Sequence, residues 1–253
     1  MGVCGRYVAR RGVAALTSEF EAADRTGDDP VSEDFNVAPT KPVPVVLSRR
    51  LGGQAEGPVV RQLRTARWGL VPSWSAGPGS GGRLLINARA ETAARTPSFR
   101  VALARRRCLV PADGWYEWAR VEPGARRQPY FLCPGDGEVL AFAGLYELWG
   151  DSRLLSTAVL TTAATGELTA VHDRMPLLVP RRSWDAWLDP TRPDPSGLLV
   201  PDPELVARIG LRPVGPAVGN VANNGPELIA PASVLPPVQV PAGLGSPVPQ
   251  VLF

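Results

Sequence analysis

The stretch Cys4-Gly5-Arg6-Tyr7 lies in the first predicted strand, residues 3–9, and it contains the cysteine on which the other candidate site residues depend. A cysteine at the amino terminus carries an α-amine and a thiol on adjacent carbons, and this pair condenses with an aldehyde to a thiazolidine ring. The unperturbed amine titrates at about 7.7 to 8.0 and the thiol at about 8.5, so both are close to their reactive forms near neutral pH. The alternative is that Cys4 is a small, buried apolar residue.

Composition predicts a globular protein with one large domain. The chain has 253 residues, of which 44% are hydrophobic and 20% are charged, and its mean hydropathy is −0.03. This length and balance suit a single core. The net charge of +3 is compatible with an anionic partner but is too small to demonstrate one. Nearly all the positive charge comes from arginine, because Lys41 is the only lysine.

The cysteines and the histidine argue against a metal site. Cys4, Cys108 and Cys133 stand at spacings that match no paired-cysteine zinc motif, and His172 is the only histidine. An odd number of cysteines favours a reducing compartment over a disulfide framework. The chain has no apolar run near 18 residues and no signal-peptide pattern. We therefore expect a cytoplasmic protein with no metal, no cofactor and no membrane partner.

Hydrophobic periodicity predicts many strands and a few short helices. Further strands are expected at 42–48, 128–132, 139–146 and 154–162, and helices at 13–23, 92–105 and 181–188. The segment 233–253 is rich in Pro, Val and Gly, which is typical of disorder. One domain at 4–232 with a partly disordered tail is the expected organisation.

Polar side chains follow a buried strand at Asn87. Asn87 and Arg89 come directly after Leu84-Leu85-Ile86 and, two residues apart on a strand, project to the same face. An amide and a guanidinium presented at the edge of a rigid sheet are typical of a site. Glu91 and Thr92 can at the same time begin the helix that follows.

A carboxylate lies among large aromatic residues at Gly114-Trp115-Tyr116-Glu117-Trp118. On a strand, Trp115 and Glu117 share one face and Tyr116 and Trp118 the other. Desolvation by such neighbours raises a carboxyl pKa, which makes Glu117 a candidate proton-transfer group at neutral pH. An ion pair between Glu117 and an arginine is the structural alternative.

Two further residue types carry candidate functions. His172 is flanked by Asp173 and Arg174 at a helix-to-strand junction, and its unperturbed pKa near 6.5 suits acid–base work, although a lone histidine is more often structural. Trp68 is expected in the core. Trp74 precedes a Gly- and Ser-rich run, so we expect it at a site rim, where its ring could stack on a base.

Six motifs in this order resemble the successive motifs of the SOS-response-associated peptidase (SRAP) family. They are Cys4-Gly5-Arg6-Tyr7, Asn36-Val37-Ala38-Pro39-Thr40, Trp68-Gly69-Leu70-Val71-Pro72-Ser73-Trp74, Asn87-Ala88-Arg89-Ala90-Glu91-Thr92, Gly114-Trp115-Tyr116-Glu117-Trp118 and His172-Asp173-Arg174-Met175-Pro176. The stretch around Asn223-Asn224 extends the resemblance to about residue 230. It implies an α+β fold, with a single compact domain whose curved, barrel-like mixed β core is flanked by short helices.

The resemblance also implies a function, because proteins of this family crosslink to abasic sites in single-stranded DNA through the N-terminal cysteine. The amine of Cys4 would attack the aldehyde of the ring-opened sugar, and its thiol would close the imine to a thiazolidine that protects the strand. Asn87 would hold the Cys4 backbone or the sugar hydroxyl, Glu117 would shuttle protons and His172 would assist ring opening. Residues implied to bind DNA, arginines at phosphates and tryptophans at a base, are Arg6, Arg89, Arg174, Trp74 and Trp118.

One feature departs from the family pattern. The family's cysteine directly follows the initiator methionine, whereas Gly2 and Val3 intervene here. With Cys4 internal, its amine is locked in a peptide bond and no thiazolidine can form. The hypothesis is that translation starts at position 3, because a GTG codon is read as methionine when it initiates and as valine when it does not. Self-cleavage ahead of Cys4 is the second hypothesis.

Two other functions remain open from the sequence. One is a thiol peptidase that uses Cys4 and His172 with Glu117 or Asn87, and the other is a non-covalent reader of modified bases. The favoured interpretation is a monomeric crosslinking enzyme with lyase-like imine chemistry and possible autopeptidase activity. Its partner is single-stranded DNA containing abasic sites, and it is expected at the nucleoid when the DNA is damaged.

Overall fold

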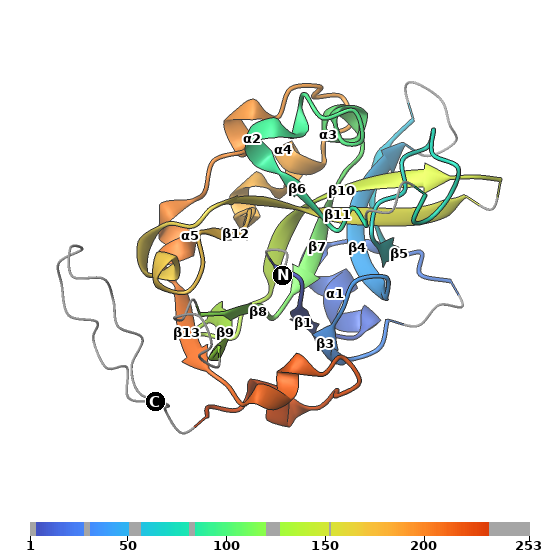
Figure 1. The fold of residues 1–253 in the computed structure, drawn as a ribbon. Helices are drawn as coiled ribbons and strands as arrows, with labels where there is room; N and C mark the ends of the chain where they lie inside the picture. Colours follow the sequence, from blue (N-terminus) through green and yellow to red (C-terminus); the bar gives the residue numbers. More distant parts are fainter. Residues whose placement is uncertain are drawn as a thin grey trace.

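The computed structural model describes residues 4–27, 31–50, 57–80, 84–119, 127–151 and 153–232, which form an α+β protein built on two β-sheets (Figure 1). The predicted tail at 233–253 lies outside the described residues. Among the helices of the described ranges, none is both long and apolar enough to cross a membrane.

The smaller sheet has five strands and is antiparallel throughout, in the order β13-β9-β8-β1-β3. Gly114 begins β8 because a Cβ there would lie 2.5 Å from the Leu132 carbonyl oxygen, so only glycine lets β8 come this close to β9. The strands are β1 (Tyr7–Ala9), β3 (Asp34–Val37), β8 (Gly114–Trp118), β9 (Pro129–Pro134) and β13 (Ile209–Pro213).

The larger sheet is mixed and runs β12-β11-β10-β7-β4-β5-β2, with β6 also paired to β11. Its last large strand, β5, pairs in parallel with β11 at Thr157↔Trp68, so the sheet curls into a ring-like arrangement that is not closed. This confirms the expected curved, barrel-like mixed core. The strands are β2 (Ala23–Asp24), β4 (Pro42–Arg50), β5 (Val59–Trp68), β6 (Asn87–Arg89), β7 (Arg107–Ala112), β10 (Leu140–Trp149), β11 (Leu154–Ala163) and β12 (Arg174–Pro176).

Aromatic side chains join the two sheets. Tyr7 of the smaller sheet meets Trp68 and Phe142 of the larger sheet edge to face, with ring centroids 5.2 and 5.9 Å apart. Trp115 meets Phe142 in the same way at 6.0 Å. Each such pair contributes about 0.5–1.5 kcal/mol beyond its buried area. Trp68 is 1% exposed, as predicted, and this cluster fixes β1 and β8 against the larger sheet.

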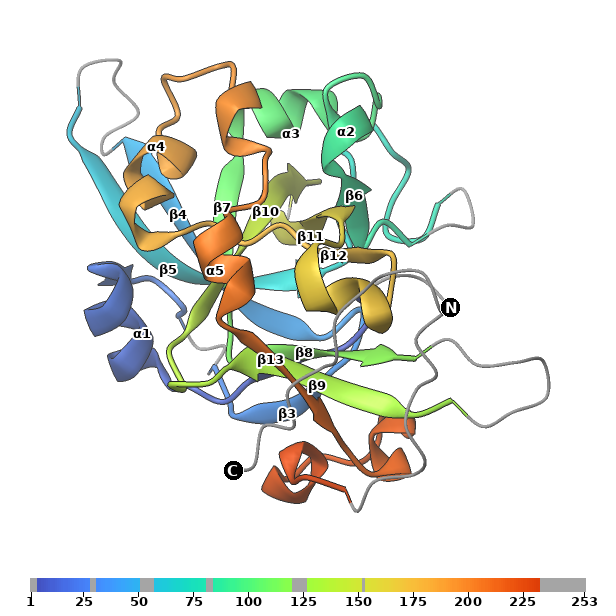
Figure 2. The ribbon, with the colours of Figure 1, turned by 90° about the vertical axis from the view of Figure 1, so that its left-hand side faces the viewer.

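The helices are short and lie around the sheets. Figures 1 and 2 show α2, α3 and α4 together at one end of the molecule and the segment 216–229 at the other. The α-helices are α1 (Val13–Phe20), α2 (Ala90–Ala93), α3 (Arg100–Arg105), α4 (Trp184–Leu188) and α5 (Pro203–Ala207). The 3-10 helices are η2 (Gly166–Ala170), η3 (Arg181–Ser183), η4 (Ser196–Leu198), η5 (Pro216–Gly219) and η6 (Pro226–Ile229).

The single helix predicted at 92–105 is wrong, because two helices occupy this region. Helix α2 ends at Ala93 and α3 begins at Arg100. Pro97 has no amide hydrogen and disfavours the helical conformation at the residue before it, which separates the two. The first helix is likewise shorter than predicted, since Glu21 adopts a left-handed φ of 49° and caps α1.

Candidate active-site pocket

Cys4 and Glu117 meet although 113 residues separate them. The backbone N–H of Cys4 donates to Oε1 of Glu117 at 2.8 Å. The pairing of Tyr7 with Trp115 brings β1 beside β8 and so sets this contact. Both residues are buried. Cys4 has a left-handed φ of 47°, which costs a non-glycine residue about 1–2 kcal/mol, and strain of this kind is typical of functional sites.

Burial controls the proton affinity of both groups. Desolvation raises the pKa of Glu117 to about 7, the hydrogen bonds from Cys4 lower it, and the charge of Asp173 raises it. Burial and then the Glu117 carboxylate raise the pKa of the Cys4 thiol well above its ordinary value, whereas the charge of Arg174 lowers it. The predicted rise at Glu117 is confirmed. Near neutral pH, Glu117 exchanges its proton while the thiol keeps its own.

A pocket of about 300 Å³ opens beside Glu117 and gathers residues from distant parts of the chain. It brings four of the predicted site residues together: Arg6, Glu117, Trp118 and His172. The remaining lining residues were not predicted as site residues, and they are Gly5, Pro39, Ile86, Arg127 and Gly219. Arg127 is an exposed cation at the start of the β9 side of the β8–β9 hairpin. Because the sequence contains many arginines, residue type alone does not mark Arg127 as a functional residue.

His172 is held between η2 and β12. Its backbone N–H donates to the Leu168 carbonyl at 3.2 Å, and its Nδ1 accepts the backbone N–H of Arg174 at 3.0 Å. Oδ1 of Asp173 also lies 3.0 Å from Nδ1. One ring nitrogen therefore faces a donor and an acceptor at the same distance.

Asn87 and the His172 segment are both attached to β11. Strand β6 pairs in parallel with one edge of β11, at Asn87↔Val159 and Arg89↔Thr161. Strand β12 pairs antiparallel with the other edge, at Arg174↔Ala163. Asn87 is half-buried and Arg89 is exposed. The neighbour of Asn87, Ile86, reaches the pocket wall.

The guanidinium of Arg174 is bound by other groups of the protein. It donates to both carboxylate oxygens of Glu91, at 2.7 and 3.0 Å, and to the Thr161 carbonyl at 2.6 Å. The bidentate geometry is the strongest form of this ion pair, and it lowers the pKa of Glu91. The guanidinium of Arg174 thus braces α2 against β11 and β12, whereas that of Arg89 stays exposed.

Arg6 and Asn36 tie the segment 218–223 to the smaller sheet. Arg6 donates to Oδ1 of Asn36 and to the carbonyl of Val218, both at 2.8 Å. Asn36 is fully buried, and its Nδ2 donates to the carbonyls of Val218, Asn220 and Asn223 at 3.3, 3.0 and 3.0 Å. The Asn36 amide therefore serves tertiary structure, because its partners lie far away in the sequence. It holds the pocket wall that contains Gly219.

The two predicted base-stacking tryptophans lie in different places. Trp118 is half-buried in the wall of the Glu117 pocket. Trp74 is 69% exposed and lines a separate depression of about 350 Å³, with Pro72, Gly77 and Leu85 among its other lining residues. A base on Trp74 would therefore sit outside the pocket of Glu117.

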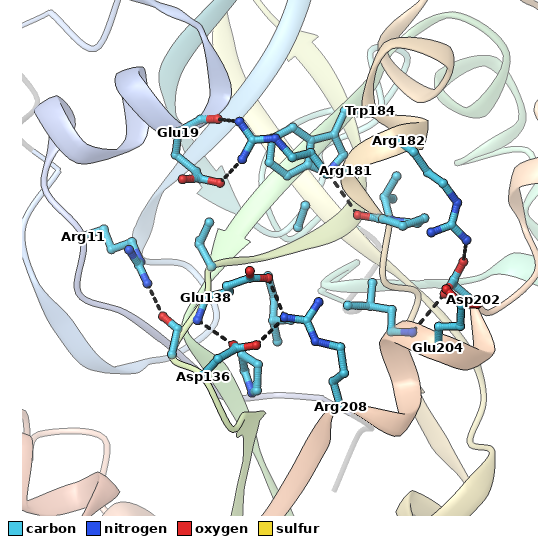
Figure 3. A pocket seen from close by; sticks show the side chains of 18 residues that line it. Arg11, Glu19, Asp136, Glu138, Arg181, Arg182, Trp184, Asp202, Glu204 and Arg208 are labelled. Carbon is cyan, nitrogen blue, oxygen red and sulfur yellow. Dashed lines mark hydrogen bonds and ion pairs between the residues drawn. The ribbon is translucent and has the colours of Figure 1, made fainter.

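Another pocket, of about 580 Å³, is lined mainly by the segments 134–141 at the β9–β10 turn, 179–184 around η3 and 202–208 around α5, with Glu19 of α1 (Figure 3). Ion pairs between its arginines and carboxylates link these elements: Arg181 with Glu19, Arg182 with Asp202, and Arg208 with Asp136 and Glu138. Because these charges are neutralised in pairs, the pocket is poorly suited to bind a nucleic-acid backbone. None of the predicted site residues lies there. Within the described ranges, no group of three or more His, Cys, Asp or Glu residues could hold a metal ion.

Comparisons with known proteins identify relatives of this chain. A model of the family "SOS response associated peptidase (SRAP)" matches residues 3–221. The chain is 31% identical to the abasic site processing protein YoqW of Bacillus subtilis (strain 168) over 231 residues, which cover 90% of this chain and 99% of YoqW. It is also 31% identical to the abasic site processing protein YedK of Escherichia coli (strain K12), covering 90% of this chain and all of YedK.

A mammalian relative and a solved structure extend the comparison. The abasic site processing protein HMCES of Rattus norvegicus is 30% identical over 276 residues, which cover 92% of this chain and 77% of HMCES. A crystal structure of a protein from Bacteroides thetaiotaomicron superposes with a TM-score of 0.75 at 20% identity, covering 91% of this chain and all of the other, and so shares the fold. The family match covers most of the chain, and this chain belongs to the SOS response associated peptidase (SRAP) family.

Proposed function

We propose that this protein processes abasic sites in single-stranded DNA, by trapping the sugar aldehyde as a thiazolidine on Cys4. The names of the curated relatives support the role in processing abasic sites. The observation that carries the chemistry is the 2.8 Å contact between the Cys4 nitrogen and the Glu117 carboxylate. If Cys4 is the first residue of the mature chain, this nitrogen is its α-amine. The crosslink then shields the strand from cleavage.

Glu117 supplies the proton transfers that this sequence of steps needs. The neutral amine forms a C–N bond to the aldehyde carbon, and the carbinolamine loses water after its hydroxyl receives a proton. Both steps suit a carboxyl group with a pKa of about 7, because it can accept a proton from the ammonium and return one to the leaving hydroxyl. The thiol sulfur then bonds to the imine carbon, and its proton moves through Glu117 to the ring nitrogen.

The state of the thiol favours this chemistry over that of a thiol peptidase. Burial and Glu117 raise the pKa of Cys4, so a free thiolate is disfavoured at this position. A peptidase that attacks as a thiolate needs the opposite shift. Ring closure tolerates a protonated thiol, because the neighbouring carboxylate takes the proton while the C–S bond forms.

The remaining site residues, within the pocket and beside it, are assigned to the DNA. His172 protonates the ring oxygen as the sugar opens, and Asn87 orients the Cys4 backbone or the sugar hydroxyl. Trp118 stacks on the base next to the lesion, where such stacking contributes about 1–3 kcal/mol. The exposed guanidiniums of Arg89 and Arg127 suit phosphate contacts. Arg6 and Arg174 lie at the border of the site, where hydrogen bonds within the protein hold their guanidiniums.

The experiment compares two versions of the protein on an oligonucleotide with one abasic site. One begins at Cys4 after removal of a preceding methionine, and the other retains a blocked Gly2-Val3 extension. Intact mass defines each terminus. We expect a heat-stable shifted band on a denaturing gel for the first version, and loss of that band with Cys4→Ala. Equal crosslinking by the blocked version would rule out the aminothiol mechanism, and unchanged DNA affinity with no crosslink in any version would support a non-covalent reader.

A further inference from the structure

We propose that Asp173 is a positioning residue for His172, which lets the imidazole take up and release a proton by exchanging partners at one ring nitrogen. In the neutral state Nδ1 accepts from Arg174, and in the protonated state Nδ1 donates to Asp173. The role of this exchange in sugar opening rests on the proposed function. The exchange itself does not, and it can be measured without DNA.

The two contacts at Nδ1 of His172 cannot be hydrogen bonds at the same time. The backbone N–H of Arg174 and Oδ1 of Asp173 each lie 3.0 Å from Nδ1 of His172. A ring nitrogen has either a lone pair or a proton in this position, so it cannot accept from Arg174 and donate to Asp173 at the same time. Acceptance from Arg174 places the single proton of the neutral ring on Nε2, and the added proton then enters at Nδ1 beside the carboxylate.

The surrounding structure keeps both partners in place. Arg174 is fixed twice, because β12 pairs with Ala163 and the guanidinium is clamped by Glu91 and Thr161. The backbone of Asp173 is fixed by a hydrogen bond from the amide of Ala164 to its carbonyl, at 2.9 Å. The carboxylate of Asp173 is 60% exposed, so it stays hydrated and can follow the proton by a small rotation. Neither state therefore needs the backbone to move.

The other charged groups near His172 come from four directions. Glu117 faces the pocket from β8, Arg6 from the chain before β1, Arg127 from the β8–β9 hairpin, and Glu91 from α2 through its pair with Arg174. Asp173 acts on two of the proton carriers at once, since its charge also raises the pKa of Glu117. A negative charge favours protonation of an imidazole and of a carboxylate alike. Removing it shifts both groups in the same direction, toward lower pH.

The sole histidine makes the test direct. In untagged protein labelled with ¹⁵N in the imidazole ring, every ring signal belongs to His172. We expect the neutral ring to carry its proton on Nε2, and Asp173→Asn to lower the midpoint of the titration by about 0.5–1 pH unit, a modest shift because the carboxylate is exposed to solvent. Asp173→Glu keeps the charge and should restore most of the midpoint. Asp194→Asn is the matched control, because it removes an exposed charge while keeping the acceptor for Ser196.

A second readout links the exchange to the reaction. The pH profile of crosslinking should move to lower pH in Asp173→Asn and stay in place in Asp194→Asn. If the wild-type protein forms no crosslink, the proposed function fails while the imidazole titration still decides the exchange. An unchanged midpoint in Asp173→Asn, or a neutral ring protonated on Nδ1, overturns the inference even where crosslinking is normal.

Discussion

The amide nitrogen of Cys4 lies 2.8 Å from Oε1 of Glu117, and this contact joins the chain just before β1 to β8 of the smaller sheet. A carboxyl group that titrates near neutral pH thus lies within hydrogen-bond distance of the nitrogen that would be the α-amine of an N-terminal Cys4. Proton transfer between the two needs no movement of either strand. The raised pKa of Glu117 should therefore make the free energy of unfolding depend on pH.

Glu117→Gln should stabilise the protein increasingly as the pH rises. The pKa of Glu117 is about 7 in the fold against 4.5 ordinarily, so the folded state binds more protons between these values and loses stability as the carboxyl ionises. The full effect is at most about 3 kcal/mol. The difference in free energy of unfolding between Glu117→Gln and wild type, measured by urea at pH 5 and pH 8, should grow with pH. Glu167→Gln, at an exposed position, should give no such trend.

Asn36→Ala should destabilise the protein by about 2–4 kcal/mol. The substitution removes the acceptor of Arg6 and the donor to three carbonyls, all in buried or half-buried positions. Urea unfolding gives the loss. Asn220→Ala, an exposed side chain on the same segment, should cost about 0.5 kcal/mol. Equal losses in the two variants would mean that the buried amide does not hold the segment.

Arg127→Ala should weaken DNA binding through a lost phosphate contact. Its exposed guanidinium lines the pocket of Glu117, and each phosphate contact contributes about one unit to the slope of log K against log salt. Binding of single-stranded DNA measured from low to high salt should therefore give a slope that is smaller by about 0.7–1. Arg181→Ala removes an arginine from the pocket of Figure 3 and should leave the slope unchanged. Identical slopes for all three proteins would exclude Arg127 from the interface.

Trp74→Ala should leave the fold intact and lower the affinity for DNA. The ring is 69% exposed, so its removal should change the free energy of unfolding by about 0.5 kcal/mol or less. Loss of a stacked base costs about 1–3 kcal/mol, or roughly 5- to 150-fold in affinity. Fluorescence anisotropy with single-stranded DNA measures this, and Trp74→Phe should keep most of the binding. An unchanged affinity in Trp74→Ala would mean that no base stacks there.

Local patterns predicted the residues whose role depends on their own strand. The alternation along Gly114-Trp115-Tyr116-Glu117-Trp118 placed Glu117 and Trp115 on one face and Tyr116 and Trp118 on the other, and the raised pKa of Glu117 followed from its burial. Trp68 was expected in the core because tryptophan is large and apolar, and it is buried. These features need only the period of a strand and the size of the neighbouring side chains.

Long-range partners could not be predicted from spacing. Glu91 and Arg174 are 83 residues apart, and they meet only because β6 and β12 lie on opposite edges of β11. The carbonyls that Asn36 binds lie more than 180 residues away in sequence. Sequence alone offered Arg174 as a candidate for a phosphate contact and Glu91 as the start of a helix. Sheet register, which decides their partners, arises from the packing of the whole chain.

Strand β11 pairs with the strand of Asn87 on one edge and with the strand of Arg174 on the other. The register of β11 therefore sets the positions of both halves of the site. Deleting a single residue within Val159–Thr161 would turn the side chains on one side of the deletion to the opposite face and shift the pairing of both neighbouring strands. The amide and the imidazole therefore cannot be repositioned independently by changes in this strand. Insertions that retune the site in natural or designed variants should fall in the loops that lead into β6 and β12, and spare β11.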